Sequence, residues 1–250
     1  MTDATTVLTA AVTVAEGEFR IGRVFARTAA LLLRNLPVYC VVTGIAAVPS
    51  VLLAEGVKPS GVAGAVWPVL VLVLVLALGT LSQAIVVHGA FQDMRGRPVM
   101  LLDALRLAFG RLLPIIGLAI CTSLAVGIGF VLLIVPGLIL LTMWFVATPA
   151  CVVERLGVSD SMARSSALTK GHRWQIFGMM ALIAIAESIG GAGLKAVLGL
   201  TASAGLVIAG TLIWTGLSSA FGAIFAVVTY HDLRVAKVGI DTQRIAAVFD

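Results

Sequence analysis

The sequence has 250 residues, of which 60% are hydrophobic and only 12% are charged. Soluble globular proteins carry about a quarter of charged residues, so this composition excludes an ordinary water-soluble domain. The net charge of +5 does not indicate a nucleic-acid-binding protein, because the 17 Lys and Arg residues lie in short clusters between apolar runs, without interleaved aromatic residues. Membrane lipid is the expected partner, and no nucleic acid is expected.

The N-terminal stretch has no basic residues ahead of its short apolar patch, and Glu16 and Glu18 follow that patch in place of a cleavage site. These features predict no signal peptide. We expect a flexible N-terminal tail over 1–18, a membrane domain over 19–235 and a cytoplasmic C-terminal tail over 236–250.

Six apolar segments of membrane-spanning length follow one another along the chain. The first two, 36–53 and 62–87, are separated by a polar turn and predict a hairpin. The uncharged run 112–153 is long enough to cross twice, and we expect Pro136 and Gly137 to form its turn. Segments 174–194 and 206–230 predict a third hairpin, with Lys195 in the turn.

The distribution of basic residues predicts the orientation of these segments. Under six crossings, Lys58 and Lys195 lie on one side, and fifteen basic residues lie on the other. These fifteen are Arg20, Arg23, Arg27, Arg34, Arg95, Arg97, Arg106, Arg111, Arg155, Arg164, Lys170, Arg173, Arg234, Lys237 and Arg244. Because cytoplasmic loops carry the excess of Lys and Arg, both termini are expected in the cytoplasm.

A basic, amphipathic segment precedes each hairpin, at 19–35, 101–112 and 159–174. This repeat predicts an all-α membrane protein with six transmembrane helices, arranged as three parallel hairpins, each preceded by an amphipathic interfacial helix. In the first segment Arg20, Arg23, Arg27 and Arg34 share one stripe, so 19–34 is expected to lie in the headgroup plane. The three cysteines, at 40, 121 and 151, all lie in apolar stretches without a CxxC pair. We expect small core residues there, with no metal site and no cofactor.

Residues 132–178 carry a detailed pattern of polar and small residues. A Pro-Gly pair is followed by an aromatic-rich helix with a Pro, a Glu and an A-x-x-S-x-L-T-K-G-x-R-W-x-x-F-G run. The matching residues are Pro136, Gly137, Trp144, Phe145, Pro149, Glu154, Ala163, Ser166, Leu168, Thr169, Lys170, Gly171, Arg173, Trp174, Phe177 and Gly178. This pattern resembles the glycerophosphoryl diester phosphodiesterase membrane domain and the related YciC-like bacterial integral membrane proteins. The resemblance implies a multi-helix domain of the bacterial inner membrane. It gives no ground for expecting hydrolase activity, because no phosphodiesterase catalytic domain is present in this sequence.

The end of this pattern provides the main candidate site. Lys170, His172, Arg173 and Trp174 are predicted to bind a lipid headgroup, with Gly171 in a left-handed conformation that turns the chain into the membrane. Glu154 and Arg155 flank the same loop, and these residues could gather around one anion. A positive-inside loop followed by an interfacial Trp is the alternative interpretation.

Glu187 is the clearest charge inside an apolar span. It predicts either an intramembrane ion or proton site or a carboxylate close enough to the outer interface to stay hydrated. The sequence has no phosphate-binding loop, no G-x-S-x-G and no H-E-x-x-H, and it offers Glu154, His88 and His231 only as loose candidates for catalysis.

These observations predict a non-enzymatic bacterial inner-membrane protein without catalytic residues. Its basic cytoplasmic face is expected to engage anionic lipid or another membrane protein, in lipid homeostasis or as an assembly subunit. The alternative is a small transporter or channel that uses Glu187 and the glycine-rich fifth helix, and a water-filled cavity reaching Glu187 would favour it.

Overall fold

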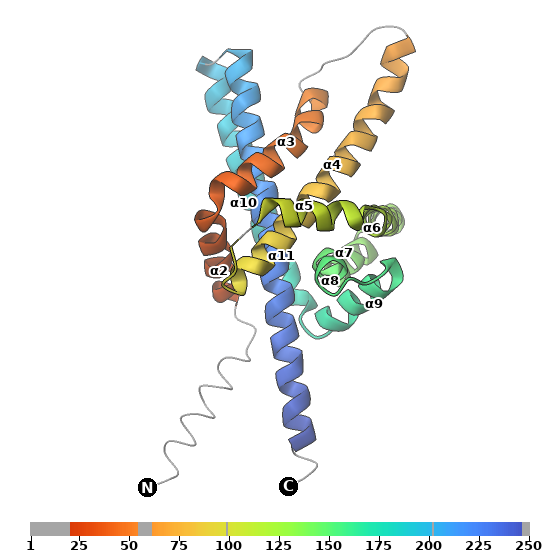
Figure 1. Cartoon of the computed structure of the whole chain (residues 1–250). Coiled ribbons are helices and arrows are strands. Elements are labelled where there is room, and N and C mark those ends of the chain that lie inside the picture. Colours follow the sequence, from red (N-terminus) through yellow and green to blue (C-terminus); the bar gives the residue numbers. More distant parts are fainter. Residues whose placement is uncertain (1–20, 55–61, 99, 202, 247–250) are drawn as a thin grey trace.

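The computed structural model describes residues 21–54, 62–98, 100–201 and 203–246. Within these ranges the chain forms helices and no β-strand, which confirms the predicted all-α fold (Figure 1). The helices are α2 (Ile21–Arg34), α3 (Leu36–Ala54), α4 (Val62–Met94), α5 (Leu101–Gly110), α6 (Leu112–Leu132), α7 (Ile134–Met143), α8 (Ala147–Val153), α9 (Val158–Thr169), α10 (Arg173–Thr201) and α11 (Ala204–Ala246). The predicted tail over 1–18 lies outside the described residues, as do Phe19 and Arg20.

Five segments of the described chain are long and apolar enough to cross a membrane. They are Val66–Met94, Leu112–Leu132, Ile134–Val153, Arg173–Leu200 and Gly205–Lys237. Helices α2 and α3 together form a sixth candidate, which is bent by 89° where they join. The molecule therefore has the five or six apolar helices of a multi-pass membrane protein.

Helix α2 is separate from the apolar helix that follows it, as the sequence predicts. Its apolar face packs onto the protein, since Val24 is buried and the Phe25 ring lies 5.3 Å from the Phe225 ring of α11. Its polar face carries Arg27, which forms an ion pair with α11. The 89° bend directs α2 away from the axis of α3, a geometry that suits a helix lying along a membrane surface.

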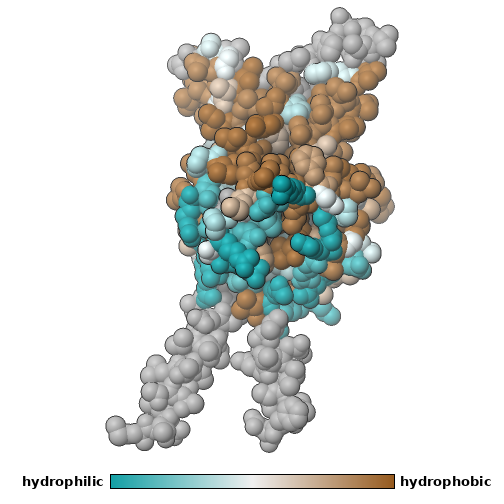
Figure 2. Space-filling view, viewed as in Figure 1, coloured by the Kyte–Doolittle hydropathy of each residue, from teal (hydrophilic) through white to brown (hydrophobic). Residues whose placement is uncertain are grey.

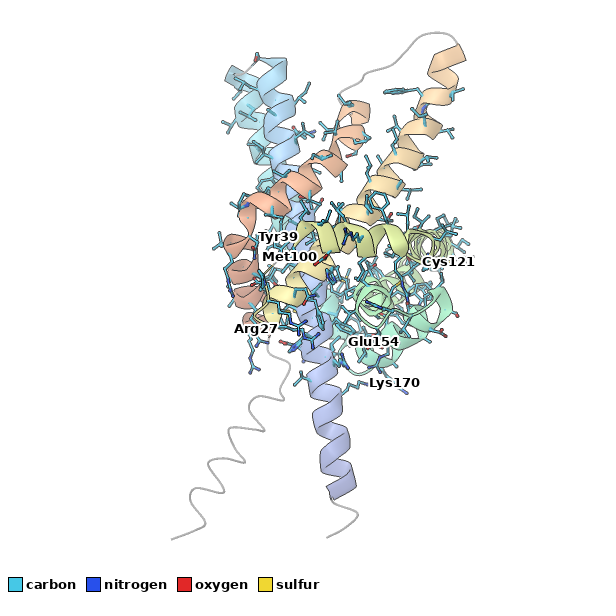
Figure 3. All side chains as sticks on the ribbon, in the orientation of Figure 1. Arg27, Tyr39, Met100, Cys121, Glu154 and Lys170 are labelled. Carbon is cyan, nitrogen blue, oxygen red and sulfur yellow. The ribbon has the colours of Figure 1, made fainter. Side chains whose placement is uncertain are left out.

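The basic segments that are distant in sequence come together in space. Two ion pairs join them: Arg27 with Asp232 (3.0 Å) and Arg34 with Asp93 (3.3 Å). A third, Arg164 with Glu154 (3.0 Å), is local to one of these segments. Figure 2 shows hydrophilic side chains over the lower half of the described chain and hydrophobic side chains over the upper half. Arg27, Glu154 and Lys170 all lie towards this polar end in Figure 3.

The apolar run 112–153 does break near its middle, but not at the predicted turn. Leu133 is extended, with φ −163° and ψ 149°, and α7 begins at Ile134. Pro136 therefore lies in the first turn of α7, where its missing N–H leaves no helical hydrogen bond unmade. Gly137 faces α6 instead, because a Cβ on Gly129 would lie 3.0 Å from the Gly137 Cα. The Pro-Gly pair thus starts α7 and permits its close approach to α6.

A second irregularity separates α7 from α8, which together make the span Ile134–Val153. The Met143 carbonyl lies at this break. It accepts hydrogen bonds from the hydroxyls of Ser165 (2.8 Å) and Thr169 (3.2 Å), both on α9. The small, hydroxyl-bearing face of α9 therefore stabilises a broken helix, because a carbonyl without a partner away from water is costly.

The third hairpin turns later than the sequence predicts. Lys195 lies inside α10, which continues to Thr201, and α11 begins at Ala204. The expectation of Lys195 in the turn is wrong, because neither the preceding glycines nor a Lys near the end of an apolar helix stops a membrane helix. Gly190 and Gly191 instead make room for the indole of Trp214 on α11.

Helix α11 organises the molecule. Its 43 residues extend for about 64 Å at 1.5 Å per residue, roughly twice a ~30 Å hydrocarbon core. It contacts α2, α3, α4, α8, α9 and α10. The predicted boundary between the membrane domain and the C-terminal tail, at 235 and 236, falls inside this helix, which continues to Ala246.

The hairpin partners predicted from the sequence are in contact, since α3 packs on α4, α6 on α7, and α10 on α11. Figure 1 shows α4, α10 and α11 running along the length of the molecule, whereas α6 is seen nearly end-on. The second hairpin therefore lies across the other two in this structure.

The three cysteines differ in burial. Cys151 is buried in α8, Cys40 is half-buried in α3 and Cys121 is exposed on α6. The expectation of core cysteines is therefore wrong for Cys121. It lies among exposed apolar residues such as Leu124, on a face that suits contact with lipid.

Candidate functional site

The turn between α9 and α10 has the predicted conformation. Helix α9 ends at Thr169, and Gly171 has a φ of +94°, which is in the left-handed region. The His172 N–H donates to the Thr169 carbonyl at 3.0 Å, so the turn is closed before α10 begins at Arg173. Lys170 and Arg173 thus flank a sharp turn at the polar end of the molecule.

Arg173 and Trp174 line a groove of about 350 Å³ between α10 and α7. The other lining residues are mostly apolar, namely Val135, Leu138, Ile139, Thr142 and Phe177. Trp174 is 85% exposed and meets the Phe177 ring edge-on, with centroids 6.2 Å apart. The Arg173 Nε is buried and has no hydrogen-bond acceptor among the described residues. A charged donor therefore lies in the wall of an apolar groove.

The other two predicted residues of this site lie beside the groove. Lys170 is exposed and His172 is half-buried. Burial lowers the pKa of His172 below its ordinary value, and the positive charge of Lys237 on α11 lowers it further. Lys237 is therefore a neighbouring cation, which sequence reasoning missed because 65 residues separate it from His172 along the chain.

Glu154 and Arg155 do not join this group, contrary to the idea that all of these residues surround one anion. The Glu154 carboxylate accepts hydrogen bonds from the Arg164 Nε at 3.0 and 3.1 Å and from the Tyr230 hydroxyl. It thereby ties α8 to α9 and α11. Arg155 lines a different cavity, together with residues of α4 and α5. No local sequence pattern could have paired Glu154 with Tyr230, which is 76 residues away.

Comparison with known proteins shows the family to which this chain belongs. Residues 99–233, more than half of the chain, match the family model described as Domain of unknown function (DUF7847). The chain belongs to the DUF7847 family. No curated protein and no solved structure matches it.

The DUF7847 region includes α5 to α10 and most of α11, so it contains the groove and the whole α9–α10 turn. Helices α2, α3 and α4 precede it. The candidate lipid site therefore belongs to the part of the chain that defines the family.

Glu187 also lies in the DUF7847 region, on α10. It is half-buried and lines a cavity of about 390 Å³. Ser218 is the other polar lining residue, beside Phe25, Leu32, Leu182, Ile183, Ala186, Trp214, Leu217 and Phe221. An apolar wall of this kind suits an acyl chain better than a water-filled path, which needs polar groups along its length.

The three loose candidates for catalysis have different partners. Glu154 pairs with Arg164, while the His88 Nε2 lies 3.5 Å from the Gln92 Nε2. The His231 Nδ1 lies 3.4 Å from a carboxylate oxygen of its chain neighbour, Asp232. Within the described part of the chain, no hydrogen bond joins any two of these three residues.

Proposed function

We propose that this DUF7847 protein is a non-enzymatic membrane protein that binds anionic lipid at the groove between α7 and α10. The observation that carries the proposal is the position of Arg173, whose buried Nε has no acceptor in the described structure and which lines an apolar groove. A lipid would complement both features. Its phosphate would accept hydrogen bonds from the guanidinium, and an acyl chain would cover the apolar wall.

The surrounding charges favour an anionic headgroup over a zwitterionic one. Lys170 flanks the same turn, and Lys237 lies close enough to His172 to lower its pKa. Each Lys or Arg near a membrane surface contributes about 1 kcal/mol of attraction to anionic lipid. The exposed indole of Trp174 would lie at the glycerol level, as Trp residues do at membrane interfaces.

We further propose that the protein lies in the bacterial inner membrane, which it crosses six times with both termini in the cytoplasm. The distribution of basic residues supports this orientation, and so does the resemblance of 132–178 to the phosphodiesterase membrane domain. Three parallel hairpins would require α6 and α7 to align with the other spans in a bilayer. The lipid-bound face would then serve lipid homeostasis or the docking of another membrane protein.

The proposal is tested by native mass spectrometry of the full-length protein released from detergent. Wild-type protein should retain phosphatidylglycerol or cardiolipin better than phosphatidylcholine. The double variant Lys170→Gln, Arg173→Gln should lose this preference. Leu138→Trp should weaken retention independently, because the larger side chain would fill the groove.

The control removes two cations from elsewhere at the polar end. Arg95 and Arg97 are exposed and do not line the groove, so Arg95→Gln, Arg97→Gln makes the same change in net charge. This control should retain anionic lipid as the wild type does. Equal retention by both double variants would show that Lys170 and Arg173 act only as topology signals, and the proposal would then be wrong.

A further inference from the structure

A separate cavity, of about 460 Å³, lies at the polar end between α4, α5 and the connection from α8 to α9. Its lining residues are His88, Asp103, Arg106, Leu107, Gly110, Arg111 and Arg155. None of them lines the groove beside Arg173. The cavity therefore has to be explained separately from the proposed lipid groove.

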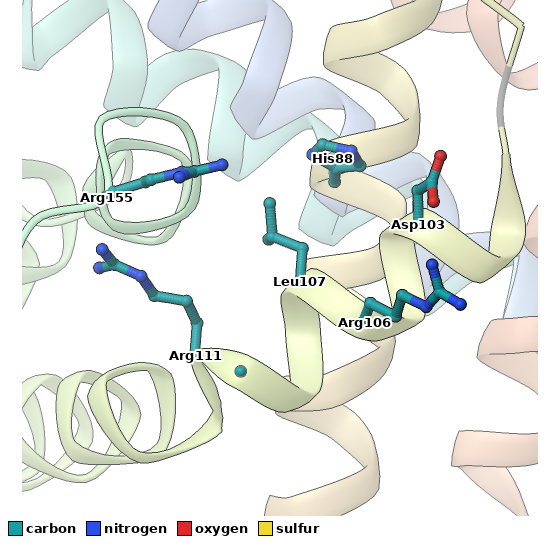
Figure 4. A pocket seen from close by; sticks show the side chains of 7 residues that line it. His88, Asp103, Arg106, Leu107, Arg111 and Arg155 are labelled. Atoms are coloured by element: carbon teal, nitrogen blue, oxygen red, sulfur yellow. The ribbon is translucent and has the colours of Figure 1, made fainter.

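Two of its arginines line the same side of the cavity. In Figure 4 the side chains of Arg111 and Arg155 both lie on one side of Leu107, and that of Arg155 extends towards His88. Arg111 comes from the junction of α5 and α6, and Arg155 lies two residues after the end of α8. The Arg111 Nη1 donates to the Leu156 carbonyl at 3.2 Å, which fixes one edge of its guanidinium and leaves its other donors for a ligand.

These two charges lack a protein counter-ion. Across the described residues, no carboxylate lies within ion-pair distance of Arg111 or Arg155. With Arg106, the cavity has three guanidinium groups against the single carboxylate of Asp103. Like charges that face one cavity repel each other, so the arrangement favours an anion between them.

The backbone of Arg155 gives a second, independent indication. Its φ is +57°, and it is the only residue other than glycine with a positive φ among those described. Such a conformation costs free energy for a residue with a long side chain, and strain of this kind gathers at binding sites. Arg155 lines the cavity in this left-handed conformation.

We propose that this cavity binds a phosphate monoester in its dianionic form, held between Arg111 and Arg155. Planar guanidinium groups match two oxygens of one phosphate, which makes paired arginines a phosphate-binding arrangement. A charge of −2 balances the surplus of two cations in the lining. The phosphate can belong to a lipid headgroup or to a soluble molecule, since the cavity recognises the same group in both.

The test measures binding to full-length protein in zwitterionic detergent by isothermal titration calorimetry. Phenyl phosphate serves as the soluble probe, and phenyl sulfate serves as a monoanion of the same shape. We expect saturable binding of phenyl phosphate. Phenyl sulfate should bind at least about tenfold more weakly, since its single negative charge makes weaker charge-assisted hydrogen bonds to the two guanidinium groups. In parallel, native mass spectrometry compares retention of phosphatidic acid, a lipid monoester, with that of phosphatidylglycerol.

The decisive variant is Arg155→Gly, because glycine adopts the left-handed conformation without strain and the variant should fold at least as well as the wild type. It should weaken binding of the preferred monoester by about tenfold, as should Arg111→Gln. Loss of phenyl phosphate binding would assign a soluble ligand, and loss of phosphatidic acid alone would assign a lipid. Unchanged binding in Arg155→Gly, or no binding of either monoester to the wild type, would overturn the proposal.

The proposals for this cavity and for the lipid groove can be refuted separately. Lys170→Gln, Arg173→Gln should leave phenyl phosphate binding unchanged, because neither residue lines the cavity. Arg155→Gly should leave the retention of phosphatidylglycerol unchanged. A loss of monoester binding in the Lys170 and Arg173 variant would show that the cavity and the lipid groove are one site, and would contradict the inference.

Discussion

Gly171 fixes the direction in which the chain leaves α9. With a φ of +94°, it adopts a conformation that side chains with a Cβ disfavour, and the His172 N–H can then close the turn on Thr169. The position of Arg173 at the groove depends on this turn. The sequence predicts it well, because a Gly after a helix end is a strong local signal.

We therefore expect Gly171→Ala to destabilise the protein by about 1–2 kcal/mol. Gly178→Ala is the matched control. Gly178 lies inside α10, and a Cβ there would meet nothing within 4 Å, so the change should stabilise by up to about 1 kcal/mol. Thermal unfolding in detergent would measure both. A Gly171→Ala variant as stable as wild type would exclude a role for the left-handed turn.

The lowered pKa of His172 predicts that the stability of the protein depends on pH. Because burial and Lys237 hold its pKa below the ordinary value of 6.5, the folded state favours the neutral imidazole. The unfolded chain therefore binds the proton first as the pH falls, and stability is lost below about pH 6.5 until the folded state is also protonated. The melting temperature should fall more for wild type than for His172→Gln between about pH 7 and pH 5. Parallel falls in the two proteins would contradict the prediction.

At the scale of elements, the packing of α10 on α11 depends on small residues. The Trp214 indole lies against Gly190 and Gly191, where a Cβ on Gly190 would overlap the ring. Small residues allow helices to approach closely in membranes, where no hydrophobic effect drives them together. The glycine-rich stretch of the fifth span thus has a packing role.

Gly190→Ala should accordingly destabilise the protein by about 1–3 kcal/mol through overpacking. Gly193→Ala, on the same helix but without a neighbour within 4 Å, should not. The penalty of Gly190→Ala should shrink in a Trp214→Leu background, because the two positions are coupled. If Gly190→Ala lowered stability equally with and without Trp214, the contact between Gly190 and Trp214 would not limit how closely α10 and α11 pack.

The existence of most elements could be predicted from the sequence, and their junctions could not. Apolar length identifies α3, α4, α6, α10 and α11, because a membrane span needs only composition. The breaks at Leu133 and Met143 depend on tertiary partners instead. Met143 is stabilised by hydroxyls from α9, a contact across 22 to 26 residues. For the same reason the sequence identified the Lys170–Trp174 turn but missed Lys237 and the cavity that Arg111 and Arg155 share.

At the scale of the whole molecule, charge and hydropathy divide the chain into two ends. Ion pairs of Arg27, Arg34 and Arg164 connect segments of the polar end. Figure 2 shows hydrophilic side chains over this end and hydrophobic side chains over the other. Large apolar side chains such as Leu113 and Val131 are exposed along α6, as expected for a surface that contacts lipid tails. Both proposed binding sites lie at the basic end, so both depend on which side of the membrane that end occupies.

Both proposed sites require the predicted topology of the chain, which cysteine accessibility in intact cells tests. Single cysteines are introduced as Lys58→Cys and Lys195→Cys in a variant with the three native cysteines, Cys40, Cys121 and Cys151, replaced by serine. Six crossings with cytoplasmic termini predict that a membrane-impermeant thiol reagent labels both positions from outside the inner membrane. Labelling of both positions only from the cytoplasmic side would contradict the topology.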